Sequence, residues 1–335
     1  MDLFAMQYLL ATVAVFVLTV AVERKLIPIL KSHKVGQVIL EIGPRWHKHK
    51  EGTPTMGGIG FILPSMLVMA CFFIYTAVQG RSAEYIPLAL TLAFGVANGA
   101  IGFVDDYCKL IKKQNEGLTA KQKLFLQLVI ASAYVTVMAY TGNLDTAVHL
   151  PFTEIYWELG WIWYPVAVLI LVGVVNGANL TDGIDGLAGS VVFVISGFFA
   201  FLAFWMQNEQ LSMLSAVLLG SSLGFLVYNF HPAKVFMGDT GSLFFGATVI
   251  GATFCIGEEL IGIIISFVFI VEMLSSFLQT GYFKLTRRLT GVGKRIFRMA
   301  PIHHHFEKCG WNEYLIVGVF SAVELLCCAI AWLAL

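Results

Sequence analysis

Charge is scarce in this chain. Asp, Glu, Lys and Arg together account for 13% of the 335 residues, whereas hydrophobic residues account for 58%. A soluble globular protein carries roughly twice that share of charge. The net charge is zero, so the composition predicts no attraction to nucleic acid. The sequence also lacks a low-complexity segment, a clear internal repeat and a polar domain, and we therefore expect one polytopic membrane domain over residues 1–335.

Cysteine patterns that bind a metal or form a disulfide framework are also missing. The six cysteines show no metal-ligand spacing, and at least three of them lie in apolar runs. We interpret them as small buried hydrophobic residues. They are Cys71, Cys108, Cys255, Cys309, Cys327 and Cys328.

Long apolar runs are what the sequence has instead. Ten of them approach the roughly 20 residues that a helix needs to cross a bilayer. We expect spans at residues 4–22, 55–78, 86–104, 122–140, 161–177, 187–206, 211–228, 243–256, 260–282 and 314–335. The first run has no basic flank before it and no small-residue cleavage site after it, so we interpret it as a span and not as a cleaved signal. The predicted fold class is an all-α integral membrane protein, a bundle of about ten transmembrane helices.

Basic residues lie almost entirely in alternate loops. Residues 23–52, 105–123, 229–242 and 283–313 hold 20 of the 21 Lys and Arg, and only Arg81 lies in the other set of loops. Because basic loops stay in the cytoplasm, this distribution predicts that both termini lie outside. The polar motifs fall in the same basic loops, so we expect an active site that faces the cytoplasm.

The densest polar motif is Asn-Leu-Thr-Asp-Gly-Ile-Asp-Gly at residues 179–186, between two apolar runs. A carboxylate at the centre of a bilayer costs about 2.5–3.5 kcal/mol, so these acids belong at a membrane face or in a wet cavity, beside a positive partner. If the stretch is helical, Asn179, Asp182 and Asp185 share one face. Gly183 would then let a ligand approach the backbone closely.

Two further acidic motifs lie beside expected spans. Asp105 and Asp106 end the third span, where two anions at the negative end of a helix dipole are unfavourable unless something compensates them. The alternative there is a solvated helix end. Asp239 lies just before the eighth span, where it is either a ligand-binding carboxylate or a helix N-cap. Asn229 and Phe236 add an amide and a stacking ring nearby, which favours the ligand role.

Lysines and histidines complete the polar set. Lys50 and Lys121 each lie at the start of an expected span, where a lysine either binds an anion or anchors the helix at the headgroups. His303, His304 and His305 form an internal triplet. Zinc binding is one interpretation of it, but a phosphate contact or a general base suits the acidic loops better. Carboxylate sites that handle phosphate commonly use Mg²⁺, so we expect this ion.

Together these motifs resemble those of the phospho-N-acetylmuramoyl-pentapeptide transferases, within the wider family of polyprenyl-phosphate N-acetylhexosamine-1-phosphate transferases. The resemblance covers essentially the whole chain. The matching motifs are Gly-Thr-Pro-Thr-Met-Gly-Gly at 52–58, the Asp pair at 105–106, Asn-Leu-Thr-Asp-Gly-Ile-Asp-Gly-Leu at 179–187, Val-Phe-Met-Gly-Asp-Thr-Gly-Ser at 235–242 and Met-Ala-Pro-Ile-His-His-His at 299–305. The last motif separates the muramoyl-pentapeptide branch from its relatives. Residues 284–294 form a segment a few residues longer than the family pattern.

The resemblance implies a reaction and a setting. Undecaprenyl phosphate attacks the β-phosphate of UDP-N-acetylmuramoyl-pentapeptide, and lipid I and UMP are formed with Mg²⁺ required. The implied place is the bacterial cytoplasmic membrane, where the product serves peptidoglycan synthesis. The resemblance also suggests a homodimer.

The resemblance further implies roles for single residues. Asp239 is the expected Mg²⁺ ligand, and His303 matches the family's essential histidine. Asp105 and Asp106 match the acidic pair that activates the lipid phosphate or attacks as a nucleophile. The uridine pocket comprises Asn179, Asp182, Gly183, Ile184 and Phe236. The polar groups around the diphosphate are Lys50, Lys121, Asp185 and Asn229, with Gln279, His304 and His305 as further substrate-binding candidates.

Two alternatives remain open at this point. A sibling transferase that uses UDP-N-acetylglucosamine shares most of these motifs, and release of UMP with each donor distinguishes the two. A divalent-cation or anion transporter belongs to another class and places polar residues near mid-membrane, on broken helices. Few charges lie there in this sequence, with Glu272 and Glu324 as the main candidates.

Overall fold

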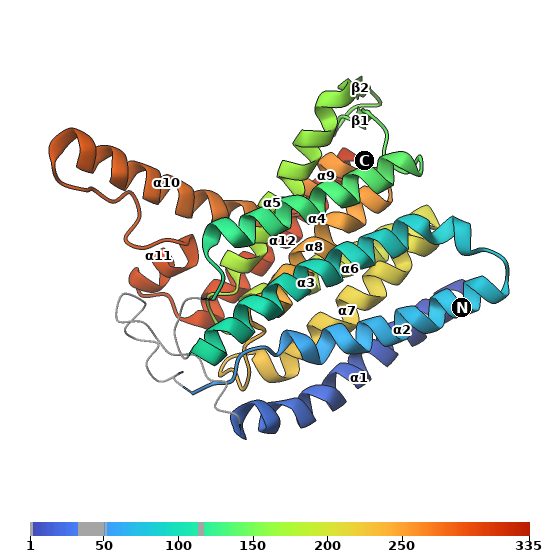
Figure 1. Cartoon of the computed structure of the whole chain (residues 1–335), viewed down its shortest axis with the longest axis horizontal. Coiled ribbons are helices and arrows are strands. Elements are labelled where there is room, and N and C mark those ends of the chain that lie inside the picture. The colour runs from blue at the N-terminus through green and yellow to red at the C-terminus, as the bar shows by residue number, and fades with distance from the viewer. Residues whose placement is uncertain (1–2, 33–49, 51, 113–116) are drawn as a thin grey trace.

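The computed structural model describes residues 3–32, 50, 52–112 and 117–335. Eight helices in this part of the chain are long and apolar enough to cross a membrane, and Figure 1 shows them as a bundle. They are α1 (Leu3–Ser32), α2 (Gly58–Val78), α3 (Ile86–Lys112), α4 (Ala120–Tyr140), α5 (Trp163–Thr181), α6 (Leu187–Met206), α7 (Glu209–Asn229) and α12 (Glu313–Ala334). The prediction of a helical membrane protein is confirmed.

Helix α8 (Gly238–Cys255) is surrounded by the protein itself. Every residue from Thr240 to Cys255 is buried, and α8 packs against α2, α3, α5, α6 and α7. Glycine, alanine, serine and threonine recur along it, and such small residues let neighbouring helices approach closely. The expected eighth span, residues 243–256, therefore corresponds to the central helix of the bundle.

The expected ninth span, residues 260–282, is not one helix. The chain forms α9 (Glu259–Ile264) and α10 (Phe267–Thr290), with a break between them. A break leaves amide groups without partners in their own helix. Here the fully buried carboxylate of Glu324 in α12 accepts a hydrogen bond from the Val268 N–H at 3.4 Å. Beyond the break, α10 leaves the bundle and projects to one side, as Figure 1 shows.

Short elements lie at the ends of the bundle. They are η2 (Ser82–Tyr85), β1 (Ala147–His149), β2 (Tyr156–Glu158), η3 (Gly160–Ile162) and α11 (Ile302–Lys308). The two strands pair antiparallel with Val148 opposite Trp157. The Phe152 N–H donates to the Ala334 carbonyl at 2.9 Å, which ties the hairpin to the end of α12. Within the described residues this hairpin is the one departure from an all-α architecture.

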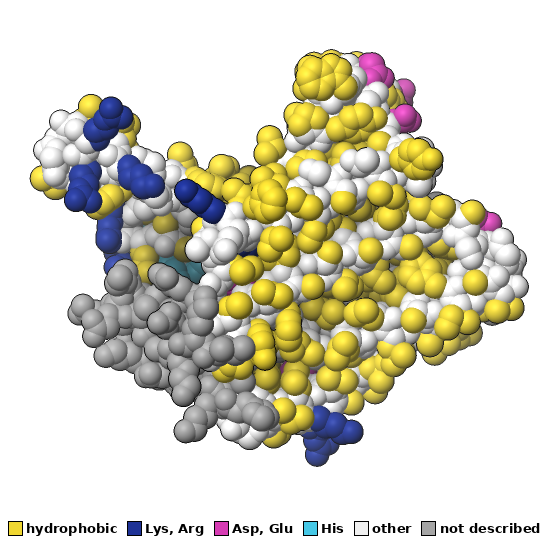
Figure 2. Space-filling model, in the orientation of Figure 1, with side chains coloured by type: hydrophobic (Ala, Val, Ile, Leu, Met, Phe, Trp, Pro, Cys, Tyr) yellow, Lys and Arg dark blue, Asp and Glu magenta, His cyan; other side chains and the backbone are white. Residues whose placement is uncertain are grey.

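The two ends of the bundle differ in charge. Figure 2 shows Lys and Arg side chains gathered on the projecting part that Figure 1 labels α10, whereas Asp and Glu lie near the β hairpin. The exposed cations of α10 are Lys284, Arg287 and Arg288. Figure 1 also places the N-terminal end of α1 and the C-terminal end of α12 away from α11. Most of the first basic loop, residues 33–49 and 51, lies outside the described residues.

The cysteines only partly match their predicted burial. All six thiols are free, and Cys255, Cys327 and Cys328 are buried as expected. The prediction is wrong for Cys71 and Cys309, which are exposed. Cys71 lies on the outer face of a spanning helix, where an apolar run cannot distinguish a side chain that faces lipid from one that faces the protein.

Candidate active site

Helices α3 and α8 touch at a glycine. A Cβ added to Gly102 in α3 would lie 2.1 Å from the carbonyl oxygen of Asp239 in α8. The absent side chain therefore lets the end of α3 pack directly on the first turn of α8. Asp105 and Asp106 follow Gly102 by about one helical turn, so the contact brings them to Asp239. One oxygen from each of these three carboxylates lies within 4.8 Å of the others.

Asp106 caps the N-terminus of α8. Its carboxylate accepts hydrogen bonds from the N–H groups of Asp239 (3.3 Å) and Thr240 (3.0 Å) and from the Thr240 hydroxyl (2.8 Å). The residue in the cap position, Met237, supplies no side-chain hydrogen bond. A carboxylate here satisfies unpaired amides and interacts favourably with the helix dipole. Asp239 is therefore not the cap, and its carboxylate faces the cations of the site.

Two lysines that were not among the predicted site residues partly neutralise these acids. Lys109 places its Nζ 2.6 Å from Asp105 and 3.3 Å from Asp239. Lys123 places its Nζ 2.8 Å from the same Oδ2 atom of Asp239. Three carboxylates thus face two ammonium groups, which leaves one negative charge in excess. Clustered carboxylate oxygens suit a hard divalent cation, so Asp105, Asp106 and Asp239 are the residues that could hold a metal.

The start of α4 decides which lysine reaches the site. Thr119 and Gln122 form a reciprocal capping box, which fixes the first turn of α4. In the resulting helix Lys121 is exposed, whereas Lys123 reaches Asp239 and also lies 3.3 Å from the Asn179 side-chain oxygen. The sequence pointed to Lys121 instead, because spacing alone does not show which face of a helix turns inward.

The central acidic motif does not continue the helix. Helix α5 ends at Thr181, and Asp182 is its C-cap. The prediction of one shared helical face is therefore wrong: the Asn179 amide donates to Asp239 at 2.9 Å, whereas Asp185 belongs to another cluster. Burial raises the pKa of Asp182 well above its ordinary value, and the negative charges of Asp239, Asp106 and Asp185 raise it further.

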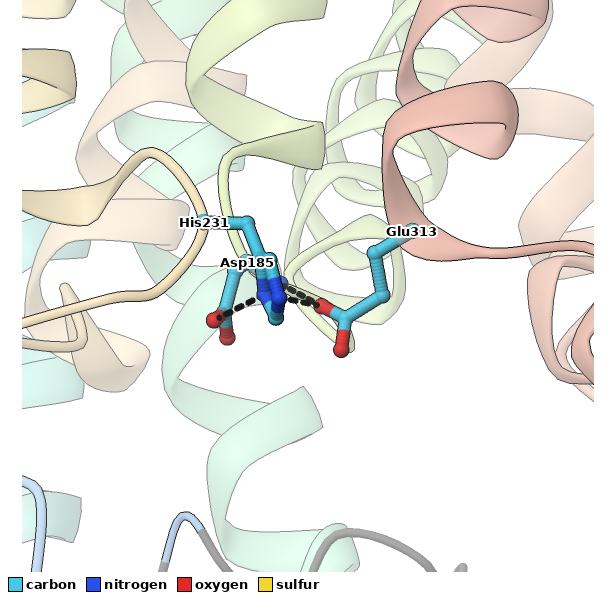
Figure 3. A group of neighbouring side chains, drawn as sticks. All are labelled: Asp185, His231 and Glu313. Carbon is cyan, nitrogen blue, oxygen red and sulfur yellow. Dashed lines mark hydrogen bonds and ion pairs between the residues drawn. The ribbon is translucent and has the colours of Figure 1, made fainter.

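A second cluster joins four distant parts of the chain. Lys50 Nζ lies 2.7 Å from Asp185 Oδ1 and 2.7 Å from Glu313 Oε2. His231 Nδ1 lies 2.9 Å from Asp185 Oδ2 and 3.6 Å from Glu313, so both carboxylates in Figure 3 turn toward the imidazole. Although burial opposes it, hydrogen bonds from Lys50, the Ala233 N–H and His231 hold the pKa of Asp185 below its usual value. The Lys50 ammonium already provides this group with a cation.

Backbone hydrogen bonds connect the loops around Phe236. The Phe236 N–H donates to the Pro54 carbonyl at 2.8 Å, and its own carbonyl accepts from the Gly57 N–H at 2.9 Å. Phe236 itself is half-buried. Asn229 is buried and accepts from the Gly186 N–H at 3.1 Å, so it holds the acidic loop in place. Ile184 is buried within that loop.

The three histidines have three different settings. His303 is fully buried, and its Nδ1 lies 3.0 Å from a carboxylate oxygen of Glu272. Its Nε2 faces Gly183, where an added Cβ would lie 2.2 Å away. The buried His304 places Nδ1 2.5 Å from Glu307. Of the triplet, His303 is thus the histidine that packs against the central acidic loop.

Gln279 and His305 contact the segment that precedes α11. Gln279 donates to the Phe297 carbonyl and accepts from the N–H groups of Ile296 and Phe297, each at 3.0 Å. His305 Nδ1 accepts from the Arg298 N–H at 3.1 Å. The hydrogen bonds of both predicted substrate-binding residues therefore shape a loop.

Four residues of the two clusters were not among the predicted site residues, and two of them had a detectable signal in the sequence. Lys109 lies four residues after Asp105, the spacing that puts both on one helical face. His231 lies in the polar loop that also carries the predicted residues Asn229 and Phe236. Lys123 and Glu313 had no local signal, because each meets its partner only through helix packing.

The fold and the site define a class: a helical membrane protein with a cluster of carboxylates at the end of its bundle. Residues 86–257 match the family model described as Glycosyl transferase family 4. This segment includes both helices that carry the three clustered aspartates.

Curated relatives extend the match to nearly the full length. The chain is 42% identical over 318 residues to a phospho-N-acetylmuramoyl-pentapeptide-transferase of Halalkalibacterium halodurans, covering 95% of this chain and 94% of that protein. It is 39% identical over 323 residues to the one of Caldicellulosiruptor bescii (96% of each chain). It is 40% identical over 312 residues to the one of Bacillus subtilis (93% and 92%). The chain belongs to the phospho-N-acetylmuramoyl-pentapeptide-transferase family.

Proposed function

We propose that the protein transfers phospho-N-acetylmuramoyl-pentapeptide from its UDP donor to undecaprenyl phosphate, giving lipid I and UMP for peptidoglycan synthesis. An oxygen of the acceptor phosphate bonds to the β-phosphorus of the donor, and the bond between that phosphorus and the bridging oxygen breaks. The observation that carries the proposal is the convergence of Asp105, Asp106 and Asp239 with two lysines, in a chain that matches the family along nearly its whole length.

The clustered residues have complementary tasks in this reaction. Lys109 and Lys123 bind phosphate oxygens once the donor enters, since lysine acts as a mobile point charge. Asp105 or Asp106 accepts a proton from the lipid phosphate or attacks as the nucleophile. A Mg²⁺ ion held by Asp239 would neutralise charge on the diphosphate. The uridine pocket comprises Asn179, Asp182, Gly183, Ile184 and Phe236. The remaining substrate contacts are Lys50, Lys121, Asp185, Asn229, Gln279, His303, His304 and His305.

The same proposal includes an orientation in the membrane. The eight apolar helices, the central helix α8 and the broken pair α9–α10 make ten crossings. Both termini lie outside, and the acidic site faces the cytoplasm, where the nucleotide is available. The gathering of cations on α10 (Figure 2) supports this orientation, because basic segments remain cytoplasmic. The location is the bacterial cytoplasmic membrane, and the family resemblance implies a homodimer there.

The test is release of UMP by the purified protein in detergent with undecaprenyl phosphate and Mg²⁺. We expect turnover with UDP-N-acetylmuramoyl-pentapeptide, none with UDP-N-acetylglucosamine, and loss of turnover on chelation of the metal. Asp239→Asn should abolish turnover while the thermal unfolding of the protein stays cooperative. Turnover of the glucosamine donor alone would assign the protein to the sibling transferases, and wild-type turnover by Asp239→Asn would remove this carboxylate from the metal site.

A further inference from the structure

A buried acid–histidine pair lies beside the acidic loop. Glu272 in α10 and His303 in α11 are both fully buried, and their Oε2 and Nδ1 atoms are 3.0 Å apart. Burying a carboxylate is expensive unless it is paired and hydrogen-bonded. The pair joins the helix that leaves the bundle to the short helix that carries the three histidines. Because the burial of a carboxylate is energetically unfavourable, this pair indicates a role beyond packing.

The pair leaves one ring nitrogen with nothing to bind. Within the described part of the chain, His303 Nε2 is buried and has no hydrogen-bond partner. That atom points at the backbone of Gly183, at a place where a Cβ would approach to 2.2 Å. Gly183 directly follows Asp182, whose raised pKa is due to burial and then to the neighbouring Asp239. An unsatisfied buried nitrogen therefore faces the acidic loop, with a glycine making room for the ring.

Because a carboxylate oxygen can only accept a hydrogen bond, an ionised Glu272 requires the hydrogen of His303 to be on Nδ1. Nε2 then has a free lone pair and is a hydrogen-bond acceptor. A carboxylate that orients a histidine in this way fixes both the tautomer and the direction of the ring. Without it, Nε2 can carry the hydrogen and the acceptor is lost.

We propose that Glu272 is a positioning residue that holds His303 with Nε2 as an acceptor for an N–H or O–H group of the bound nucleotide donor. The proposal rests on the proposed function for the identity of that donor. It goes beyond the family resemblance, which names the histidine and not the acid behind it.

Three variants test this role. Glu272→Gln keeps an oxygen that can accept from Nδ1, whereas Glu272→Leu removes the acceptor at similar size. We expect kcat/KM for the nucleotide donor to fall about 10- to 100-fold in Glu272→Leu and much less in Glu272→Gln, since groups that orient a histidine have effects in this range. The KM for undecaprenyl phosphate should not change. Glu324→Gln is the matched control, because Glu324 is also a fully buried carboxylate but bonds to the backbone of α10.

Two further readouts separate positioning from simple loss of folding. On a His303→Ala background, Glu272→Leu should not lower kcat/KM for the nucleotide donor any further, because the acid acts only through the ring. In ¹⁵N spectra of histidine-labelled protein in nanodiscs, the resonance missing from His303→Ala should report an Nδ1–H ring in the wild type and change in Glu272→Leu. An unchanged resonance, or equal losses in Glu272→Leu and Glu324→Gln, would overturn the proposal.

The outcomes also distinguish this inference from the proposed function. If the wild type fails to turn over the muramoyl-pentapeptide donor, the proposed function fails. The tautomer measurement needs no substrate, and the kinetic comparison can then use whichever donor is turned over. If the wild type is active and the tautomer does not depend on Glu272, only the positioning role is lost.

Discussion

Gly102→Ala should abolish most of the turnover, although Gly102 itself has no functional group. The added Cβ would lie 2.1 Å from the Asp239 carbonyl oxygen and 2.3 Å from its carbonyl carbon. Both atoms belong to the backbone of a fully packed helix, so they cannot move aside as a flexible side chain does. Helices α3 and α8 must therefore separate at this level, and Asp105 and Asp106 move away from Asp239 with them.

The expected magnitudes follow from the geometry. Forcing an extra methyl group into a packed interior costs about 1–3 kcal/mol, which should lower the thermal unfolding temperature without preventing folding. A displacement of about 1 Å in a catalytic constellation costs about 100-fold in rate. Separation also lengthens the hydrogen bonds from the Asp239 and Thr240 amides to Asp106, which cap α8. We therefore expect turnover to fall by two orders of magnitude or more.

The assay compares UMP release and thermal unfolding for Gly102→Ala and Gly318→Ala. Gly318 lies in α12, and a Cβ there meets nothing within 4 Å. Alanine is a better helix former than glycine by up to about 1 kcal/mol, so the control should be active and no less stable than the wild type. Wild-type turnover by Gly102→Ala would refute the reasoning, because it would mean that the close contact does not set the distance between the acids.

Two other predictions concern the loops around the acids. Asp182→Asn should raise the unfolding temperature at pH 7, and it should raise it less at pH 4. Burial raises the pKa of Asp182 in the folded protein. The ionised carboxylate therefore destabilises the fold at pH values above its ordinary pKa and not below it. Equal gains at both pH values would contradict the raised pKa. Phe236→Ala should weaken UMP binding by about 1–3 kcal/mol, the range for losing an aromatic stack on a base, as measured by calorimetry in detergent. An unchanged dissociation constant would remove the ring from the uridine pocket.

The broken helix α9–α10 resembles a transporter feature, but the acids beside it already have partners. A discontinuous helix with buried acids at the break is the pattern that marks binding sites in many transporters. Here the break is occupied by Glu324, which bonds to the Val268 amide at the start of α10. Glu272, the second mid-membrane acid that the sequence indicated, is paired with His303. Among the described residues both acids have structural partners, and the carboxylate cluster lies elsewhere.

The sequence by itself determined the class of protein and the chemistry of its loops. The length of an apolar run and the position of lysines and arginines are local properties, and the bilayer acts on them directly. The capping box at Thr119 is equally local, because it joins groups only three residues apart. The motifs at Asp105, Asp182 and Asp239 are also local, because the sequence shows their residue types even where their contacts are unknown.

Only the tertiary structure decided which partner each of these groups takes. Asp106 caps a helix that begins 132 residues later in the chain, at Gly238, and Lys123 rather than Lys121 turns toward Asp239. Asn179 and Asp185, six residues apart, join different clusters because α5 ends between them. Such choices depend on the phase and separation of packed helices. In this protein, contacts at Gly102 and Gly183 set those separations, and no local pattern encodes them.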